Sequence, residues 1–489
     1  VACMLTALHL LMTGEFMTSK KTRIVATLGP ASAALETVEQ LIMAGVNVFR
    51  LNFSHGTHES HLAAIKTIRQ ASEKTGRFTA ILGDLCGPKI RVGKFASGPI
   101  ELNAGDSFFI SENPDEPGTQ QGIGTSYPYL TKDLRPGNSV LLDDGNIMLE
   151  VVDIAGNRVN CRVLDGGPLK DKKGLSMPGI PLSIETITDK DRADLKFMIE
   201  HQLDFVALSF VRKAKDLIDL QQLIGDAQIR IIAKIEKPEA LDEIDQILDN
   251  CEGVMIARGD LGVEMPIQQV PAVQKQLLLK CGRRGKTVIT ATQMLESMIE
   301  NQRPTRAETT DVFNAIVEGS DAVMLSGETA AGRFPVDAVK MMAAIATEAE
   351  KVSSDNYERI NNLLPEVGNA IEEVMAHAAC EAAMNVEARA IVPFTHSGNT
   401  ALHISKYHPP TPVFALTPKE ATCRRLSLSW GVTPILVKDI RNTDEMIAMA
   451  EKTLKELGIA KPGDVIVIVA GVPLGVKGNT NLMKLHRIS

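Results

Sequence analysis

Aromatic residues and long apolar runs are both scarce in this sequence. Of its 489 residues, 4% are aromatic and one is tryptophan. Proteins that bind single-stranded nucleic acid usually stack the bases on aromatic side chains, so this scarcity argues against that class. No stretch approaches the roughly 18 consecutive apolar residues that indicate a membrane-spanning helix. We therefore expect no nucleic-acid partner and no membrane partner.

The sequence also lacks a net positive charge and closely spaced pairs of cysteines. The formal net charge is −8 and no long basic block is present, so an anionic substrate must be held by local positive charge. The seven cysteines are scattered and include no CxxC pair, which argues against a disulfide framework or a zinc knuckle. A reducing environment suits such a chain, and we expect a cytoplasmic location.

The length and composition predict several globular domains. The length provides for roughly three domains of about 150 residues each, and a hydrophobic content of 44% supports large cores. Residues 1–16 form an apolar stretch without the basic start of a secretory signal. Because Met17 opens a more ordinary protein sequence, we interpret residues 1–16 as an extension upstream of the native start.

Eight apolar runs with the character of buried strands alternate with helical patterns. They lie at residues 23–28, 46–52, 78–84, 204–210, 229–236, 253–257, 287–291 and 321–325. Continuous apolar strands that alternate with helices indicate a parallel sheet covered by helices. Eight such units predict an α/β fold, a closed (β/α)8 TIM barrel, with its active site at the carboxyl ends of the strands. We expect the barrel to comprise residues 17–87 and 187–351.

The alternation is interrupted after the third strand and changes character after the eighth. Residues 88–186 are rich in turn formers, which predicts a small inserted all-β domain placed to close over the barrel as a lid. Its expected strands lie at 107–110, 139–143, 147–153 and 158–163. Residues 352–489 predict a C-terminal open α/β domain with a regulatory role. Its expected strands lie at 389–394, 412–416, 433–437, 464–469 and 482–486.

Two of the predicted barrel strands end in charged residues. Lys234 and Glu236 are two residues apart, so their side chains share a face, and Asp260 ends the next strand. The carboxyl ends of parallel strands meet at one rim, which brings two carboxylates and one ammonium together. Mg²⁺ is typically bound by one or two carboxylates, with substrate oxygens completing its shell. The pattern favours chemistry on a phosphorylated anion, with a plain salt bridge as the alternative interpretation.

Polar residues also end other predicted barrel strands. Arg50, Asn52 and Ser54 alternate along the second strand and share a face. Arg suits bidentate contact with phosphate, and the oxygens of Asn and Ser suit a monovalent cation. The third strand ends near Asp84 and the seventh near Thr292. Each residue alone more often caps a turn, but the convergence of four strand ends favours an active site.

Eight stretches of the sequence have the character of family motifs, namely KTRIVATLGPAS (21–32), FRLNFSHG (49–56), GPKIR (87–91), IIAKIE (231–236), MIARGDLGVE (255–264), ITATQMLESM (289–298), PTRAE (304–308) and MLSGETAAG (324–332). Through these motifs the chain resembles the pyruvate kinase family, and the resemblance extends over essentially its whole length. The resemblance implies transfer of a phosphoryl group from phosphoenolpyruvate to ADP, giving pyruvate and ATP, as the final step of glycolysis. It also implies Mg²⁺ or Mn²⁺ as a cofactor and a homotetrameric assembly.

The same resemblance implies roles for individual residues at the barrel rim. Those implied to contact the substrate or its phosphoryl group are Lys234, Arg50, Gly259, Asp260 and Thr292, and those implied to bind the divalent metal are Glu236 and Asp260. The candidate catalytic residues among them are Lys234, Arg50 and Thr292. Two sources of the proton for the enolate carbon stay open, namely Thr292 through water and the neighbourhood of Ser326 and Glu328.

The nucleotide and a monovalent cation have implied binding residues as well. The nucleotide residues are Asn52, His55, Arg91 and Lys173, and the potassium residues are Asn52, Ser54, Asp84 and the backbone of Leu85. The sequence departs from the commonest family pattern at Lys89, where potassium-requiring members typically carry Glu. Because an ammonium is itself a fixed monovalent cation, we hypothesise that Lys89 replaces potassium.

The loop at residues 395–400 is a candidate effector site in the C-terminal domain. Small hydroxyl residues and a glycine at a helix N-terminus suit a phosphate group, and in the resembled family this loop binds a phosphorylated allosteric effector. The expected contacts are Thr395, Ser397, Gly398, Asn399 and Thr400, with residues 471–481 as a cover. An ordinary helix N-cap is the alternative interpretation.

Two other functions compete with the kinase prediction. One is a metal-dependent barrel lyase or aldolase that acts on pyruvate or its enol, and the other is a sensor without enzymatic activity. The nucleotide clamp implied at Arg91 and Lys173 disfavours the lyase, because cleavage of a carbon–carbon bond needs no nucleotide. The intact set of charged residues at the rim disfavours the sensor.

Overall fold

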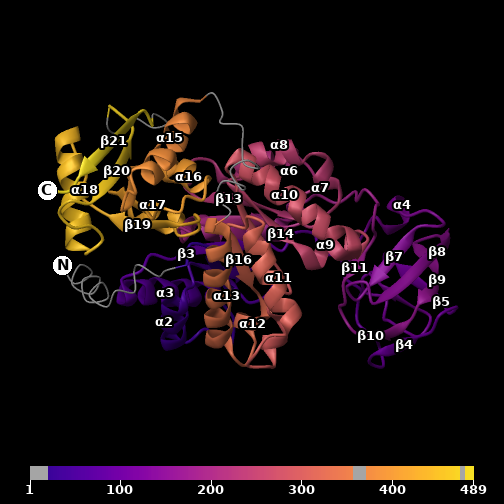
Figure 1. Ribbon diagram of the computed structural model, residues 1–489. Helices are drawn as coiled ribbons and strands as arrows, with labels where there is room; N and C mark the ends of the chain where they lie inside the picture. The colour runs from indigo at the N-terminus through magenta and orange to yellow at the C-terminus, as the bar shows by residue number, and fades with distance from the viewer. Residues whose placement is uncertain (1–19, 356–369, 474–479) are drawn as a thin grey trace.

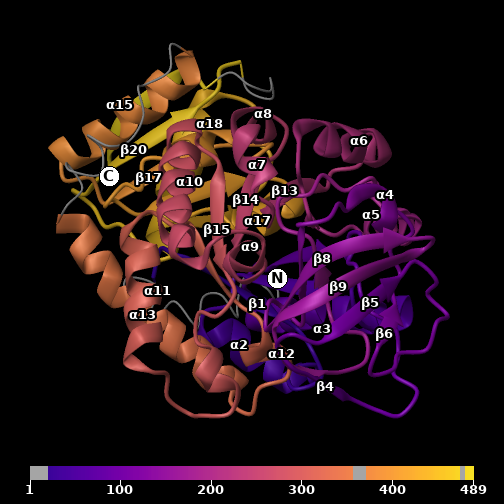
Figure 2. The same ribbon diagram turned by 90° about the vertical axis from the view of Figure 1, so that its right-hand side faces the viewer.

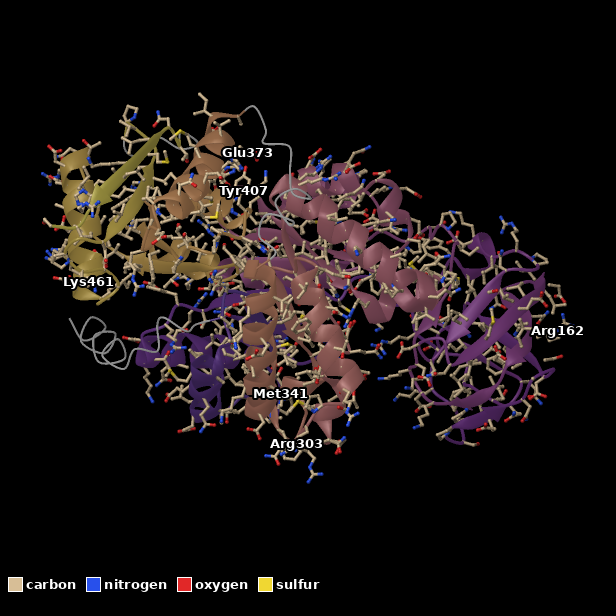
Figure 3. All side chains as sticks on the ribbon, viewed as in Figure 1. Arg162, Arg303, Met341, Glu373, Tyr407 and Lys461 are labelled. Carbon is tan, nitrogen blue, oxygen red and sulfur yellow. The ribbon has the colours of Figure 1, made fainter. Side chains whose placement is uncertain are left out.

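The molecule consists of three parts arranged in a row (Figure 1). The computed structural model describes residues 20–355, 370–473 and 480–489, so the predicted extension at 1–16 lies outside the described residues. The barrel lies in the middle, with the β-rich lid on one side and the C-terminal domain on the other. The side chains of Arg162 in the lid and Lys461 in the C-terminal domain project at opposite ends of the molecule (Figure 3).

Eight parallel strands close the central barrel in the order β1-β16-β15-β14-β13-β12-β3-β2. They are β1 (Arg23–Thr27), β2 (Val48–Asn52), β3 (Ala80–Asp84), β12 (Phe205–Leu208), β13 (Arg230–Ile235), β14 (Gly253–Ala257), β15 (Thr287–Ala291) and β16 (Ala322–Leu325). All eight predicted strands are confirmed. Strand β12 pairs directly with β3, so the inserted lid leaves the barrel sheet uninterrupted.

Helices cover the outside of the barrel. They are α2 (Leu35–Ala44), α3 (His58–Thr75), α5 (Asp189–Glu200), α6 (Ala214–Ile224), α7 (Glu239–Asp242), α8 (Ile244–Asp249), α10 (Val270–Arg284), α11 (Arg306–Val317) and α13 (Pro335–Asp355). Local sequence fixes several of their ends, because Thr57 forms a capping box at the start of α3 and Gly76 ends it in the left-handed region, at φ 65°. Their apolar faces pack on the strands to form the largest core of the protein.

Two short helices follow barrel strands directly, namely α9 (Arg258–Glu264) after β14 and α12 (Gly327–Ala330) after β16. We predicted Asp260 at the end of a strand, but it lies in the first turn of α9. The reason is that the backbone leaves the extended region at Ala257, with ψ 81°. Beyond that point the N–H of Gly259 donates to the hydroxyl of Thr292 and not to a strand ladder.

The lid is an all-β domain with its own hydrophobic core. Its larger sheet has the order β11-β7-β8-β9-β5-β6, and β4 pairs with β10 in a second sheet. The four predicted strands are present as β5 (Ser107–Ser111), β7 (Ser139–Leu142), β8 (Ile147–Ala155) and β9 (Arg158–Asp165). The remaining strands are too short to be detected from sequence, namely β4 (Ile100–Leu102), β6 (Gly122–Gly124), β10 (Gly167–Leu169) and β11 (Leu175–Ser176), and a short helix is α4 (Leu130–Asp133).

The C-terminal domain is a five-stranded sheet between two layers of helices (Figures 1 and 2). Its strands are β19 (Val432–Leu436), β18 (Val413–Thr417), β17 (Ala390–Pro393), β20 (Val465–Ala470) and β21 (Leu482–Arg487), in that order. Helices α15 (Ile371–Asn385), α16 (Asn399–Ser405) and α17 (Glu420–Leu426) pack on one face, and α18 (Thr443–Glu456) packs on the other. The predicted open α/β architecture is confirmed.

The C-terminal domain closes the amino end of the barrel. Leu428 is 2% exposed and packs with apolar side chains of the barrel interior. Asp204, just before β12, forms ion pairs with Arg69 of the barrel and Arg424 of the C-terminal domain, with nitrogen–oxygen distances of 2.9 Å in both. The opposite, carboxyl end of the barrel therefore stays open toward the lid. Among the described residues, no helix is both long and apolar enough to cross a membrane.

Candidate active site

A buried charge cluster lies at the carboxyl end of the barrel. Lys234, on β13, lies with its Nζ 2.8 Å from Glu236 Oε1 and 3.2 Å from Asp84 Oδ1. The two carboxylate side chains are each 1% exposed. The structure thus joins two strand ends that are far apart in the sequence, and one ammonium lies between two carboxylates.

Arg50 extends this cluster from β2. Its Nε lies 2.6 Å from Asp84 Oδ2, and one terminal nitrogen donates to Thr27 Oγ1 at 3.0 Å. Ser209, just after β12, accepts a hydrogen bond from Lys234 Nζ at 2.7 Å and donates one to the carbonyl of Leu85. Two cations and two carboxylates therefore share one rim, and their positions are fixed by neighbouring hydroxyl groups.

The cluster shifts the pKa values of its members. Burial alone would lower the pKa of Lys234, but the nearby carboxylates of Asp84 and Glu236 raise it well above its ordinary value. Burial raises the pKa of Glu236 in spite of Lys234. Burial also acts to raise the pKa of Asp84, but Lys234 and Arg50 outweigh it and the net pKa is lowered. Lys234 therefore stays a cation throughout the physiological range.

Asp260, Gly259 and Thr292 meet beside this cluster. The N–H of Gly259 donates to Thr292 Oγ1 at 2.8 Å, and Thr292 takes a positive φ of 69°. Asp260 is near enough to act on the pKa values of both Lys234 and Glu236. Its carboxylate accepts no hydrogen bond or ion pair within the described parts of the chain, so its oxygens are free for a ligand.

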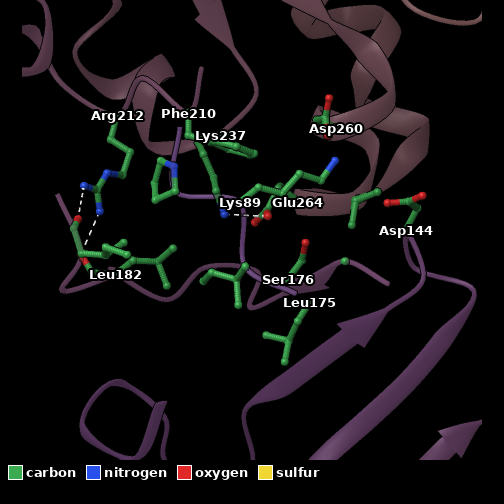
Figure 4. A pocket seen from close by; sticks show the side chains of 15 residues that line it. Lys89, Asp144, Leu175, Ser176, Leu182, Phe210, Arg212, Lys237, Asp260 and Glu264 are labelled. Carbon is green, nitrogen blue, oxygen red and sulfur yellow. Dashed lines mark hydrogen bonds and ion pairs between the residues drawn. The ribbon is translucent and has the colours of Figure 1, made fainter. Parts of the chain in front are cut away.

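A cleft between the barrel rim and the lid opens onto Asp260 (Figure 4). Its wall includes Lys89 and the buried ion pair between Lys237 and Glu264, whose nitrogen and oxygen lie 2.6 Å apart. The lid contributes residues around β11, including Ser176. Burial raises the pKa of Glu264, and Lys237 only partly offsets that effect.

Known proteins are similar to this chain over nearly its whole length. The family description "Pyruvate kinase, barrel domain" matches residues 19–339, and "Pyruvate kinase, alpha/beta domain" matches residues 373–486. A pyruvate kinase of Geobacillus stearothermophilus is 47% identical over 475 residues, which are 96% of this chain and 81% of the relative. A pyruvate kinase of Staphylococcus aureus strain MRSA252 is 46% identical over 479 residues, or 96% and 80% of the two chains. The chain belongs to the pyruvate kinase family.

The fold agrees with this family over its full extent. The crystal structure of a pyruvate kinase from Cryptosporidium parvum matches with a TM-score of 0.90 at 38% identity, and the match covers 97% of each chain. As a pyruvate kinase, the enzyme is a glycolytic phosphotransferase that forms pyruvate and ATP from phosphoenolpyruvate and ADP. The predicted family, fold and reaction are confirmed.

Pyruvate kinases typically use a divalent metal, and the rim offers few groups to hold one. Among the described residues, no group of three or more His, Cys, Asp or Glu side chains is placed to bind a metal. Glu236 and Asp260 are two carboxylates at the rim that could hold a metal as a two-carboxylate donor set. This set fits Mg²⁺, which takes one or two carboxylates and completes its shell with substrate oxygens and water. The free carboxylate of Asp260 supports the fit.

The residues expected around potassium in this pyruvate kinase already have protein partners. Asn52 Oδ1 accepts the N–H of Ser54 at 3.1 Å, and the carbonyl of Leu85 accepts the hydroxyl of Ser209 at 2.7 Å. Strand β2 ends at Asn52, so Ser54 lies in the following turn and not on the strand face that we predicted. Lys89 is half-buried in the cleft and, within the described parts of the chain, forms no ion pair.

The expected nucleotide residues of the kinase are divided between the barrel and the lid. Asn52 ends β2 and the exposed His55 follows it, whereas Arg91 lies between β3 and β4, and Lys173 lies between the lid strands β10 and β11. Arg91 donates to the carbonyl of Lys172 at 2.9 Å. Lys173 Nζ lies 2.6 Å from Asp143, within the lid. Arg91 thus lies near Lys173, and among the described residues no hydrogen bond or ion pair joins either of them to Asn52 or His55.

The predicted effector loop leads into α16. Gly398, with φ 99°, caps the helix without a side-chain hydrogen bond, and its N–H donates to Thr395 Oγ1 at 2.9 Å. The hydroxyl groups of Thr400 and Thr480 lie 2.9 Å apart. Of the expected cover at 471–481, residues 474–479 lie outside the described residues. The loop therefore contacts at least one end of its predicted cover.

Sequence reasoning missed three residues that organise the site. Thr27 and Ser209 each contact a charged member of the cluster. Arg258, at the start of α9, donates to the carbonyl of Thr292 at 2.9 Å and pairs with Asp311 at 2.7 Å. Thr27 and Ser209 are polar residues near the ends of predicted barrel strands, and that position is the signal that could have revealed them.

Proposed function

We propose that phosphoryl transfer in this pyruvate kinase takes place at the cluster of Lys234, Arg50, Glu236 and Asp260. The single observation that supports this most is the buried ammonium of Lys234 between two carboxylates, beside a free carboxylate on α9. The proposal gives Lys234 and Arg50 the role of contacting the phosphoryl group. Glu236 and Asp260 hold the divalent metal, Mg²⁺ or Mn²⁺.

The proposed mechanism relies on charge that is already in place. A divalent metal held by Glu236 and Asp260 would neutralise negative charge on the bound substrate. Lys234 remains protonated because two carboxylates stabilise it, so it can meet the negative charge of the phosphoryl group without a proton transfer. Two unit charges about 4 Å apart interact by about 4 kcal/mol at an effective dielectric near 20, which is close to a thousandfold in rate.

The substrate side of the proposal rests on Gly259 and Thr292. Their mutual hydrogen bond places backbone and hydroxyl groups next to Asp260, where the carboxylate end of phosphoenolpyruvate would bind. Thr292 is also the residue to which we assign delivery of the proton through water. Ser326 and Glu328 are the alternative, and both oxygens of Glu328 already accept backbone N–H groups, from Leu295 and Ser326.

The proposal also assigns residues to the nucleotide and to the monovalent cation. Asn52, His55, Arg91 and Lys173 bind the nucleotide, and movement of the lid would have to bring the last two toward the barrel. Lys173 must then leave Asp143, its partner at 2.6 Å. Lys89 takes the place of potassium near Asn52, Ser54, Asp84 and Leu85, which is supported by the partners that the oxygens of Asn52, Asp84 and Leu85 already have. Potassium is then not required.

The regulatory and cellular parts of the proposal extend beyond the barrel. Thr395, Ser397, Gly398, Asn399 and Thr400 bind a phosphorylated activator, and the enzyme acts as a homotetramer in the cytoplasm. We also propose domain boundaries at residues 87/88, 186/187 and 351/352. The first two are supported by the end of β3 at Asp84 and the start of α5 at Asp189, whereas α13 continues through the third boundary to Asp355.

The metal assignment can be tested without turnover. We expect wild-type enzyme to bind Mn²⁺ in the presence of phosphoenolpyruvate and absence of ADP, as measured by electron paramagnetic resonance of the free ion. The variants E236Q and D260N should each lose most of this binding, because each removes one of two carboxylate ligands. Wild-type affinity in both variants would contradict the assignment.

A further inference from the structure

A second buried ion pair lies beside the proposed metal ligands. Lys237 directly follows Glu236 in the chain, and Glu264 lies four residues after Asp260 on α9. Lys237 Nζ is 2.6 Å from Glu264 Oε1, and both side chains are 6% exposed. Figure 4 marks the contact with a dashed line in the wall of the cleft that Asp260 also lines.

The pair connects the two segments that carry the metal ligands. Residues four apart on a helix lie on the same side, so Glu264 is one turn below Asp260. Its partner belongs to the segment that leaves β13 immediately after Glu236. A contact between Lys237 and Glu264 therefore restrains the distance between the two ligand carboxylates.

Helix α9 needs such a restraint. It has only seven residues, and its N-cap, Ala257, provides no side-chain hydrogen bond. A helix this short is weakly stable without tertiary contacts. Arg258 anchors its first residue through Asp311 and the carbonyl of Thr292. The ion pair of Glu264 anchors its last residue, so the two contacts together fix the direction of the helix.

We propose that the Lys237–Glu264 ion pair positions Asp260 opposite Glu236 at the separation that one divalent cation requires. Both are positioning residues, because they act through the two ligands and do not touch the metal. The inference rests on the proposed function, which assigns Glu236 and Asp260 as ligands. Removal of groups that orient metal ligands typically weakens metal affinity by about 10- to 100-fold.

A direct role for Lys237 in binding nucleotide fits the structure less well. The ammonium is committed to Glu264, and with both side chains only 6% exposed it cannot reach a ligand without leaving a buried carboxylate unpaired. Ser176, on the lid strand β11, also interacts with Glu264, so the acidic member of the pair faces the lid. The geometry thus favours a structural link between α9 and its surroundings.

The test is direct Mn²⁺ binding to K237M and E264Q, again with phosphoenolpyruvate and without ADP. We expect each variant to raise the dissociation constant for Mn²⁺ by about tenfold or more. The double variant K237M/E264Q should bind Mn²⁺ about as tightly as the single variant with the lower affinity, because both substitutions break the same contact. As a matched control, K406M removes another buried lysine, paired at 2.8 Å with Glu373 in the C-terminal domain, and should bind Mn²⁺ as wild type does.

The variant E264D keeps the proposal testable if the others fail to fold. E264D retains both charges but has an acidic side chain shorter by one methylene group, which disturbs the contact with Lys237. A folded E264D should therefore bind Mn²⁺ more weakly than the wild type. Unchanged Mn²⁺ affinity in the folded variants overturns the inference, even while losses in E236Q and D260N support the proposed function. A raised KM for ADP with unchanged Mn²⁺ affinity also overturns it, because Lys237 would then be a nucleotide ligand.

Discussion

The carboxylate of Asp84 provides a demanding test of the charge cluster. Asp84 is 1% exposed and lies 2.6 Å from Arg50 and 3.2 Å from Lys234. The substitution D84N leaves two buried cations with only Glu236 to compensate them. Removal of one charged partner from a buried ion pair costs about 3–5 kcal/mol of folding stability. At roughly 2–4 °C per kcal/mol, the barrel transition should shift down by roughly 10 °C in a thermal scan.

The lowered pKa of Asp84 also determines how the difference in folding stability between wild type and D84N changes with pH. Because the folded pKa of Asp84 is lowered below its ordinary value of 3.8, its contribution is fully present above that value. The contribution disappears as the pH falls through the folded pKa. The stability difference between wild type and D84N should therefore be constant near neutral pH and shrink toward the lowest pH at which both remain folded.

A matched control separates this effect from the loss of any ion pair. Asp219 pairs with Lys215 at 2.6 Å, but its side chain is 43% exposed. Exposed pairs of this kind contribute about 0–1 kcal/mol, so D219N should leave the thermal transition nearly unchanged. A D84N enzyme that is destabilised no more than D219N would refute the reasoning, because Asp84 would then not be compensating the two cations.

Two further predictions concern the monovalent cation and the activator. Wild-type turnover should change by less than about tenfold between potassium-free and potassium-rich buffers of equal ionic strength, whereas K89E should become potassium-dependent, because it removes the fixed cation from the cleft. Strong activation of the wild type by potassium would reject this role of Lys89. The double variant S397A/T400A should lose the increase in rate that sugar phosphates or nucleoside monophosphates produce in the wild type, because it removes two hydroxyl groups from the loop at α16. Unchanged activation of that variant, in a titration of the same compounds, would exclude the loop as the effector site.

Strand positions were predictable from sequence because burial on both faces leaves a continuous apolar run. The run at Ile231–Ala233 therefore indicated β13, and the polar residues just beyond it marked the rim. The position of Asp260 was less predictable, because a helix of seven residues carries little periodic signal. Its start depends on the hydrogen bond from Gly259 to Thr292, which joins residues distant in the sequence.

Partners of the charged residues were the hardest part of the site to predict. Ser209 is one of many serines, and its role appears only when β12 lies beside β13 and its hydroxyl accepts Lys234. The role of Lys237 is likewise hidden in the sequence, because its partner Glu264 lies on another element. Charged residues at strand ends have a chemical signature in the sequence, whereas the groups that hold them in place depend on tertiary contacts.

Lys234 is proposed to stabilise the phosphoryl group during transfer, and a single kinetic assay can test this role. ADP-dependent formation of pyruvate from phosphoenolpyruvate should be measured at saturating Mg²⁺ for the wild type and K234M, with thermal unfolding as the check that the variant is folded. We expect an active wild type and a folded K234M whose kcat is lower by about a thousandfold. A folded K234M whose kcat is within about tenfold of the wild type would contradict it.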